Sequence, residues 1–198
     1  MSYQQEFINT FKPLLTAQLY KKGEFDRWIG FEYIVKNLLN MNKPLYIVET
    51  GTLNSDNNWL GFGQSTMIWD WLISKTKGIV NSVDIDLNNI KFARSKCNNI
   101  NFVHCDSVGY LRGLDENNID LLYLDSYNWS KEDHISSCLH HMTELGAIWD
   151  RLPKNCIIAV DDRHNDLDGK HALVELFFTN IIKIQPVIRC HMIIWVKP

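Results

Sequence analysis

Residues 44–51 read PLYIVETG, and this stretch decides the fold. After the proline come four consecutive apolar residues, followed at once by Glu49, Thr50 and Gly51. A short apolar run without polar alternation is typical of a strand buried on both faces of a parallel sheet. We therefore predict a strand here that ends in a turn carrying a carboxylate and a glycine.

The same pattern recurs four times along the chain. The apolar runs and the acids that follow them are residues 79–83 before Asp84, 100–104 before Asp106, 119–124 before Asp125, and 156–160 before Asp161 and Asp162. Helical segments are predicted at residues 65–75, 87–97, 131–152 and 170–178. Strands that alternate with helices predict a parallel sheet covered on both faces.

Two final apolar stretches, residues 181–188 and 190–196, are joined by a link too short for a crossover, so we expect them to be antiparallel. The predicted fold class is therefore α/β, a Rossmann-like, doubly wound and mostly parallel sheet of seven strands with a C-terminal antiparallel hairpin. In such sheets ligands bind outside the carboxyl ends of the strands. The five acidic strand ends are expected to carry the chemistry there.

The N-terminal residues predict two amphipathic helices before the sheet. Apolar side chains fall at helical spacing at Phe7, Phe11, Leu14, Leu15 and Leu19, and again at Ile29, Tyr33, Ile34, Leu38 and Leu39. These helices could cover the active site, form an oligomer face or simply cover the core. We interpret the chain as one domain, with residues 1–43 as a helical cover and residues 44–198 as the core.

The composition fits a soluble globular protein. The net charge of −3 argues against a broad electrostatic footprint for nucleic acid, and no run of 18 apolar residues indicates a membrane span. The five cysteines are odd in number and form no Cys-x-x-Cys pair, which favours buried thiols in a reducing compartment. The start lacks a basic segment followed by a long apolar one, so the cytoplasm is the expected location.

The order of the strand ends resembles that of class I S-adenosylmethionine-dependent methyltransferases. The motifs are ETG at 49–51, VDID at 83–86, CDS at 105–107, LD at 124–125 and VDD at 160–162. More narrowly, the chain is similar to the magnesium-dependent O-methyltransferases of the catechol, caffeoyl-CoA and macrolide-sugar types. The resemblance covers roughly residues 44–198 and none of the first forty.

The resemblance implies that the first loop binds the methionine part of the cofactor. Glu49 would orient the charged end, while Gly51 and Gly63 would let the backbone approach without a side-chain clash. Ser65, at the start of a predicted helix, would offer free N–H groups to the cofactor carboxylate. Residues 53–60 depart from the compact family loop and look like an insertion that could act as a lid or contact the acceptor.

The second and third strand ends are expected to hold the nucleoside. The carboxylate of Asp84 can accept hydrogen bonds from both ribose hydroxyls. Asp106 and Ser107 resemble the residues that contact adenine, although a helix cap explains them equally well.

Asp125, Asp161 and Asp162 resemble the family's ligands for a divalent cation, Mg²⁺ or otherwise Mn²⁺ or Ca²⁺. The ion would lower the pKa of the acceptor hydroxyl, and Asp125 would share in catalysis. These acids could instead cap helices or bind the ammonium group of the cofactor. Three carboxylates at one sheet end repel one another unless protons, a cation or a basic side chain compensate their charge. Arg163 is the nearest basic residue in sequence.

The general base is a second departure, because Asn128 stands where the family often has Lys or His. His164 is our preferred replacement because it closely follows the aspartate pair, although a surface loop histidine is an equally good reading. Lys131 and His134 are alternatives.

The expected function is methyl transfer from S-adenosylmethionine to a small-molecule hydroxyl, as on a sugar or a catechol, with help from a divalent metal. A catalytically silent binding protein and a nucleic-acid methyltransferase are the alternatives. A nicotinamide dehydrogenase is disfavoured because the sequence has no compact Gly-x-Gly-x-x-Gly loop. A homo-oligomer is compatible with all of these readings.

Overall fold

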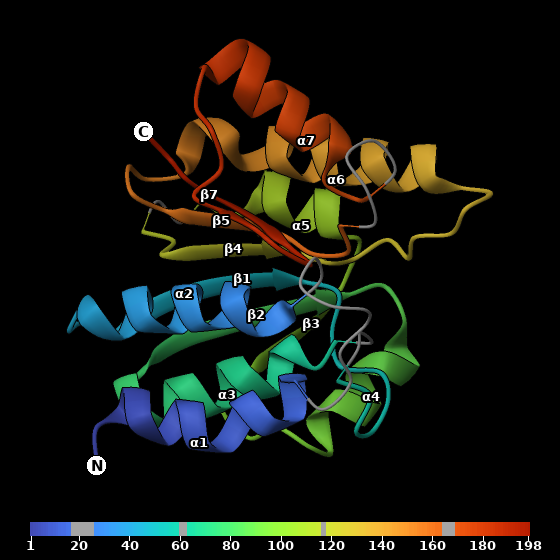
Figure 1. Ribbon diagram of the computed structural model, residues 1–198. Coiled ribbons are helices and arrows are strands. Elements are labelled where there is room, and N and C mark those ends of the chain that lie inside the picture. The colour runs from blue at the N-terminus through green and yellow to red at the C-terminus, as the bar shows by residue number, and fades with distance from the viewer. Residues whose placement is uncertain (17–25, 60–62, 116–117, 164–168) are drawn as a thin grey trace.

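The computed structural model describes residues 1–16, 26–59, 63–115, 118–163 and 169–198, and Figure 1 shows them around one sheet. The strands are β1 (Leu45–Thr50), β2 (Gly78–Asp84), β3 (Asn101–His104), β4 (Leu121–Leu124), β5 (Ile157–Val160), β6 (Ile188–Arg189) and β7 (Ile193–Val196). They form a seven-stranded sheet in the order β3-β2-β1-β4-β5-β7-β6. Strands β1 to β5 are parallel, while β7 is antiparallel to both β5 and β6, so the predicted fold class is confirmed.

The strand order reverses between β1 and β4, which are neighbours in the sheet although two strands and three helices lie between them in the chain. Thr50 at the end of β1 pairs with Val83 of β2 on one side and with Leu124 of β4 on the other. The carboxyl ends of these three strands therefore open at one place. Such a switch point is where open α/β sheets bind ligands.

Helices cover both faces of the sheet (Figure 1). The helices are α1 (Tyr3–Thr16), α2 (Arg27–Asn40), α3 (Ser65–Thr76), α4 (Leu87–Arg94), α5 (Ser107–Gly113), α6 (His134–Ile148) and α7 (Ala172–Leu176), with a 3₁₀ turn at Trp149–Arg151 and a π-helix at Phe177–Ile182. Side chains of α1, α2 and α3 share one apolar cluster, and those of α5, α6 and α7 share another. Within the described residues, every helix is too short or too polar to cross a lipid bilayer.

The N-terminal helices cover the core. Phe7 of α1 stacks on Trp28 of α2, with ring centroids 5.2 Å apart, and both side chains are buried. Phe11 of α1 lies against Trp59, whose ring centroid is 5.8 Å away. Of the three roles considered for these helices, core cover is the one that their packing demonstrates.

The C-terminal hairpin is shorter than predicted. The strand predicted at residues 181–188 is wrong over its first part, because Ile181 and Ile182 end a π-helix. The reason is tertiary packing, because the buried Phe178 stacks on Trp195 of β7 at 4.6 Å between ring centroids and holds this segment against the sheet. The helix α5 was also missed, since the prediction recognised only its cap.

Candidate functional site

A cavity of about 350 Å³ opens at the carboxyl ends of β1 to β4. Its lining consists of Gly51, Val83, Asp84, Ile85, Asp106, Ser107, Ser126, Tyr127 and His140. Four residues of the predicted cofactor site, which come from three strand ends, thus share one cavity. Two of the other lining side chains, Ile85 and Tyr127, are apolar or aromatic yet 73% and 38% exposed.

Gly51 is required by the geometry of the first strand end. Its φ is +80°, and a Cβ atom there would lie 2.5 Å from the carbonyl oxygen of Asp125. The first turn is therefore packed directly against the end of β4, which only a glycine permits. Gly63 has a φ of +72°, and its Cβ would meet the carbonyl oxygen of Thr52 at 2.3 Å. Gly63 thus serves the contact between two backbone segments, and it is not among the residues of the cavity lining.

Asp84 is fixed at the mouth of the cavity by hydrogen bonds. Its Oδ1 accepts from the backbone N–H of Asp86 at 2.7 Å. Its Oδ2 accepts from the N–H of Thr52 and from Asn89 Nδ2, both at 3.2 Å. A carboxylate has about four acceptor positions, so this one is oriented and still has capacity for a ligand hydroxyl.

Glu49 differs from the expectation, because its side chain is fully buried and is absent from the cavity lining. Its carboxylate accepts hydrogen bonds from Ser65 Oγ at 2.6 Å, Thr66 Oγ1 at 2.7 Å, Trp69 Nε1 at 2.9 Å and Ser82 Oγ at 2.7 Å. Burial raises the pKa of Glu49 to about 7, although the hydroxyl donors oppose the shift.

The role of Glu49 in this structure is to connect β1 to α3 and β2. The predicted partner Ser65 is also buried, and its hydroxyl is directed at Glu49. The four hydrogen bonds occupy the acceptor positions of the Glu49 carboxylate, so it has none free for the charged end of a cofactor. Binding of the cofactor carboxylate by N–H groups at Ser65 stays a prediction.

Of the two roles that the sequence left open for Asp106 and Ser107, the structure shows the helix cap, and contact with adenine stays a prediction. Asp106 caps α5, since its Oδ2 accepts from the N–H of Gly109 at 2.7 Å. Both residues also line the cavity. The hydroxyl of Ser107 lies 3.1 Å from Nε2 of His140 on α6.

His140 is a cavity residue that the sequence analysis missed, because a histidine in the middle of a helix has no local signal of function. Its Nε2 lies 3.4 Å from Oε1 of the buried Glu144, and hydrogen bonding to this carboxylate raises the pKa of His140. Glu144 also accepts from Ser126 Oγ at 2.7 Å. These contacts orient the imidazole of His140, which faces Ser107 at the end of β3.

Asp125, Asp161 and Asp162 lie close together, as predicted, but cationic side chains compensate them. Lys170 Nζ lies 2.5 Å from Asp125 Oδ1 and 2.9 Å from Asp162 Oδ2, and the lysine side chain is 2% exposed. Burial disfavours its charge, yet the two carboxylates outweigh burial and raise the pKa of Lys170. The same ammonium group holds the pKa of Asp162 well below its usual range despite the burial of that carboxyl.

Asp161 has a different cation. It forms a buried ion pair with Arg27 of α2, and its Oδ2 also accepts from Tyr123 Oη at 2.7 Å. Its Oδ1 accepts from the backbone N–H of Asp162 at 2.9 Å. The basic residue expected near this pair was Arg163, but the compensation seen here comes from the distant residues Arg27 and Lys170.

These contacts test whether the acids fit a divalent cation. Ligand atoms of Asp161, Asp162 and His191 lie within 4.8 Å of one another, which by itself could suit an ion. Asp162 Oδ1, however, lies 3.2 Å from His191 Nε2, and its Oδ2 is bound to Lys170. Since both oxygens of Asp161 are also bound within the protein, the predicted metal set does not fit an ion without displacement of a buried cation.

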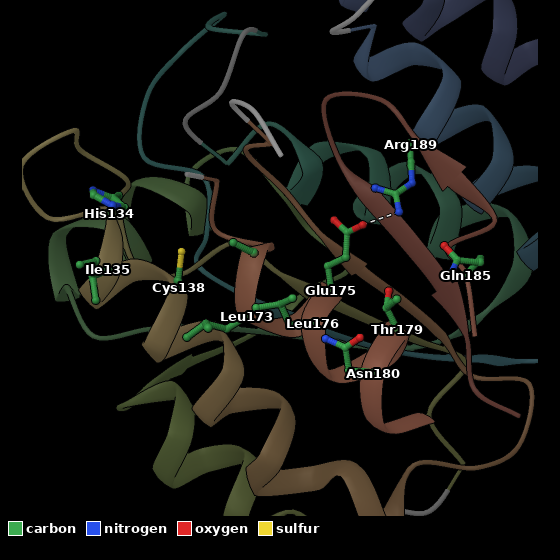
Figure 2. Close-up of a pocket in the computed structure, with 11 residues that line it drawn as sticks. His134, Ile135, Cys138, Leu173, Glu175, Leu176, Thr179, Asn180, Gln185 and Arg189 are labelled. Carbon is green, nitrogen blue, oxygen red and sulfur yellow. Dashed lines mark ion pairs between the residues drawn. The ribbon is translucent and has the colours of Figure 1, made fainter. Parts of the chain in front are cut away.

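The residues considered for the general base are exposed, line a different cavity or lie outside the described residues. His164 falls in the segment 164–168, which is outside the described residues. Asn128 and Lys131 are exposed. His134 lines a different cavity, also of about 350 Å³, between α6 and α7 (Figure 2).

That second cavity is crossed by an ion pair between Glu175 and Arg189, as Figure 2 shows. Apolar side chains such as Ile135 and Leu176 line it. Among its described lining residues, none belongs to the predicted cofactor or metal set. The cavity at the strand ends is therefore the candidate site.

The insertion at residues 53–60 is attached to the body of the protein over its described part. Leu53 and Trp59 are buried, and the N–H of Leu53 donates to Thr66 Oγ1 at 3.0 Å. Asp56 forms an ion pair with Lys96 of 2.8 Å. Residue 60 lies outside the described residues. The proposed lid thus has fixed contacts near both ends.

Comparison with known proteins identifies the fold. No protein-family model and no curated protein matches the sequence. The O-methyltransferase NovP is similar in structure, with a TM-score of 0.60 and 12% identity over 86% of this chain and 79% of that chain. The MycE methyltransferase of mycinamycin biosynthesis, in complex with Mg and SAH, gives 0.61 and 10% identity over 98% of this chain and 54% of that one.

A methyltransferase from Geobacter sulfurreducens gives a TM-score of 0.54 and 14% identity over 98% of this chain and 85% of that chain. The chain spans about half the length of MycE. At these identities the likeness establishes the fold, so the predicted resemblance is confirmed at that level: the chain has the Rossmann-like fold of the methyltransferases.

Proposed function

We propose that this chain is an S-adenosylmethionine-dependent methyltransferase that acts on a hydroxyl group of a small molecule. The observation that supports this most is the lining of the strand-end cavity. Gly51, Asp84, Asp106 and Ser107 were selected from sequence as cofactor residues, and all four line one cavity at the switch point of a methyltransferase fold.

The chemistry of the lining suits a nucleoside with a charged tail. Asp84 is oriented to accept hydrogen bonds from ribose hydroxyls. The exposed side chains of Ile85 and Tyr127 provide apolar surface for a flat purine ring. Ser107 and His140 add polar groups that could recognise the ring edge. We assign contact with the methionine part to the backbone of Gly51, which lines the cavity, in place of the side chain of Glu49.

When bound, the cofactor supplies an electrophilic methyl group on a sulfonium ion. The protein must then place an acceptor oxygen in line and accept its proton. Asp125 directly precedes the cavity residues Ser126 and Tyr127, and we propose that it helps to place the acceptor oxygen, whereas the sequence analysis gave it a share in catalysis as a ligand of a divalent cation. His164 stays a prediction for the group that accepts the proton.

A small acceptor is favoured over nucleic acid because the chain carries a net charge of −3. MycE and NovP are named as a methyltransferase of the mycinamycin pathway and an O-methyltransferase, which supports the O-methyl assignment. The metal in MycE is not transferred to this chain, since Lys170 and Arg27 already bind the acids that would hold it.

Calorimetric titration with S-adenosylhomocysteine tests the cofactor site. We expect saturable binding, and Asp84→Ala should weaken it at least about fivefold, since ribose hydroxyls would lose a hydrogen-bond partner worth about 1 kcal/mol. Asp86→Ala is the matched control, because Asp86 caps α4 and does not line the cavity. Equal affinity for Asp84→Ala and wild type would refute the site.

Turnover is then tested with S-adenosylmethionine and a panel of sugars and catechols. Methyl transfer to an oxygen in any of them would establish the activity. Binding of the cofactor without transfer to any acceptor would favour the alternative, a silent binding protein.

A further inference from the structure

The structure assigns to Lys170 the place of a divalent cation: we propose that its ammonium group, instead of a metal ion, balances Asp125 and Asp162 at the strand ends. This charge balance can be tested whether or not the chain transfers methyl groups. Its consequence, that turnover is independent of metal, rests on the proposed function.

The ammonium group is bound on all sides by oxygen atoms. Lys170 Nζ lies 2.5 Å from Asp125 Oδ1, 2.9 Å from Asp162 Oδ2 and 3.4 Å from the carbonyl oxygen of Asp125. A lysine ammonium has three N–H donors, so these three oxygens account for all of them. With a side chain that is 2% exposed, Lys170 is a buried component of the cluster and not a surface lysine that water could replace.

The backbone keeps Lys170 in this position. Its N–H donates to the carbonyl oxygen of Asp162 at 3.3 Å. At the preceding residue, Gly169, a Cβ atom would lie 2.7 Å from the same carbonyl oxygen. Asp162 itself has a φ of +55°, an unusual backbone conformation for an aspartate. Close packing of the backbone against Asp162 therefore fixes the point from which the Lys170 side chain reaches the two carboxylates.

The remaining acid is compensated separately. Asp161 is fully buried and forms its ion pair with Arg27, which is 5% exposed. His191 Nε2 lies 3.2 Å from Asp162 Oδ1. The three carboxylates face only two cationic side chains, Lys170 and Arg27, so one negative charge remains in the cluster. A divalent ion would overcompensate this charge and would lie next to a buried ammonium and a buried guanidinium.

Metal titration of the apo-protein tests the proposal without any cofactor or acceptor. Binding of Mn²⁺ is followed by electron paramagnetic resonance of the free ion. Wild type should show no saturable binding at millimolar Mn²⁺. Lys170→Ala, which leaves Asp125 and Asp162 without their cation, should bind one Mn²⁺ with a Kd at least tenfold below the highest Mn²⁺ concentration at which wild type shows no saturable binding. Lys170→Ala combined with Asp162→Asn should lose the gained binding.

Lys96→Ala is the matched control, because Lys96 also pairs with an aspartate, Asp56, but at the surface. It should remain like wild type. If Lys170→Ala does not fold, Lys170→Arg replaces it; this variant keeps the charge and should also bind no Mn²⁺. The presence or absence of saturable Mn²⁺ binding by wild type then decides the proposal. Saturable Mn²⁺ binding by wild type that disappears in Asp162→Asn would overturn the proposal, as would a folded Lys170→Ala that gains no binding.

The rate of methyl transfer provides a second, independent test of the proposal. Once an acceptor is known, EDTA should leave the rate of methyl transfer by the wild type unchanged. A rate lost in EDTA and restored by Mg²⁺ would overturn the proposal while supporting the proposed function, and absence of turnover with every acceptor would count against the function alone.

Discussion

Arg27 and Asp161 form a buried ion pair that joins the first turn of α2 to the end of β5, across 134 positions of the sequence. The two side chains are 5% and 0% exposed. The guanidinium also lies over the ring of Phe31, at 5.7 Å from its centroid. The N-terminal helical cover thus supplies a charge to the strand-end cluster as well as apolar surface to the core.

Substitution of Arg27 by methionine should destabilise the protein by about 3–5 kcal/mol, because removal of one partner leaves a buried charge at Asp161. Urea unfolding followed by circular dichroism measures the loss. Lys43→Met is the control, since Lys43 pairs with Asp120 at 2.6 Å but is 48% exposed, and exposed pairs contribute at most about 1 kcal/mol. Equal losses in the two variants would show that the buried pair has no special weight.

Gly51→Ala should lower stability by about 1–3 kcal/mol and weaken S-adenosylhomocysteine binding, because the alanine would be strained at a φ of +80° and would collide with the backbone of Asp125. The matched control is Gly146→Ala in α6, where a Cβ meets nothing within 4 Å. That variant should gain about 0.5–1 kcal/mol from the lower entropy of its unfolded chain. Thermal unfolding measures the stability of both variants, and calorimetric titration measures their affinity for S-adenosylhomocysteine. A Gly51→Ala variant with wild-type stability and wild-type affinity would contradict the geometry of the first turn.

Glu49 should make stability depend on pH. Its pKa is raised to about 7 in the folded protein, from an ordinary value of 4.5. Between these two values the folded state keeps a proton that the unfolded chain releases. The stabilisation is therefore complete below pH 4.5 and is lost as the pH rises through 7. Glu49→Gln cannot titrate, so its unfolding free energy should fall less than that of wild type between pH 5 and about 8.

Urea unfolding of the two proteins at several pH values measures this difference. Glu132→Gln, at an exposed position between β4 and α6, should retain the wild-type slope. If the unfolding free energies of wild type and Glu49→Gln change with pH in parallel, the Glu49 carboxyl is charged over the whole pH range measured.

His140→Ala should weaken S-adenosylhomocysteine binding about fivefold, because Ser107 would lose its partner at 3.1 Å and the cavity would lose a polar group worth about 1 kcal/mol. His134→Ala removes a histidine from the first turn of the same helix, and this residue lines the other cavity. It should bind like wild type. Calorimetry of both variants distinguishes a contact with the ligand from a general effect on α6.

The sheet and the cavity could be predicted because they depend on local pattern. An apolar run marks a strand and the acid after it marks the strand end, so Gly51 and Asp84 could be predicted to lie together, and they line one cavity. The same reasoning failed for Glu49. An acid that turns into the core and one that faces the cavity have equivalent positions in sequence, and only the hydroxyls of Ser65 and Thr66 on α3 decide between them.

The partners of the acidic cluster could not be predicted from sequence distance. Arg163 is adjacent to the aspartate pair, yet the charges of Asp161 and Asp162 are balanced by Arg27 and Lys170. Arg27 reaches the site because α2 packs beside the sheet, and Lys170 because its segment folds back on Asp162. Both contacts depend on tertiary packing, which a periodicity argument does not contain.

The position of β7 between β5 and β6 has a consequence for synthesis on the ribosome. Parallel pairing of β1 to β5 uses only residues up to Val160, but the outer edge of β5 is closed by Ile193–Val196. Chains emerge from the ribosome in sequence order, so the sheet is left with an open apolar edge until Val196 has left the exit tunnel. Unpaired edges recruit other strands. A nascent chain stalled before Ile193 should therefore be the form of this protein that most needs a chaperone.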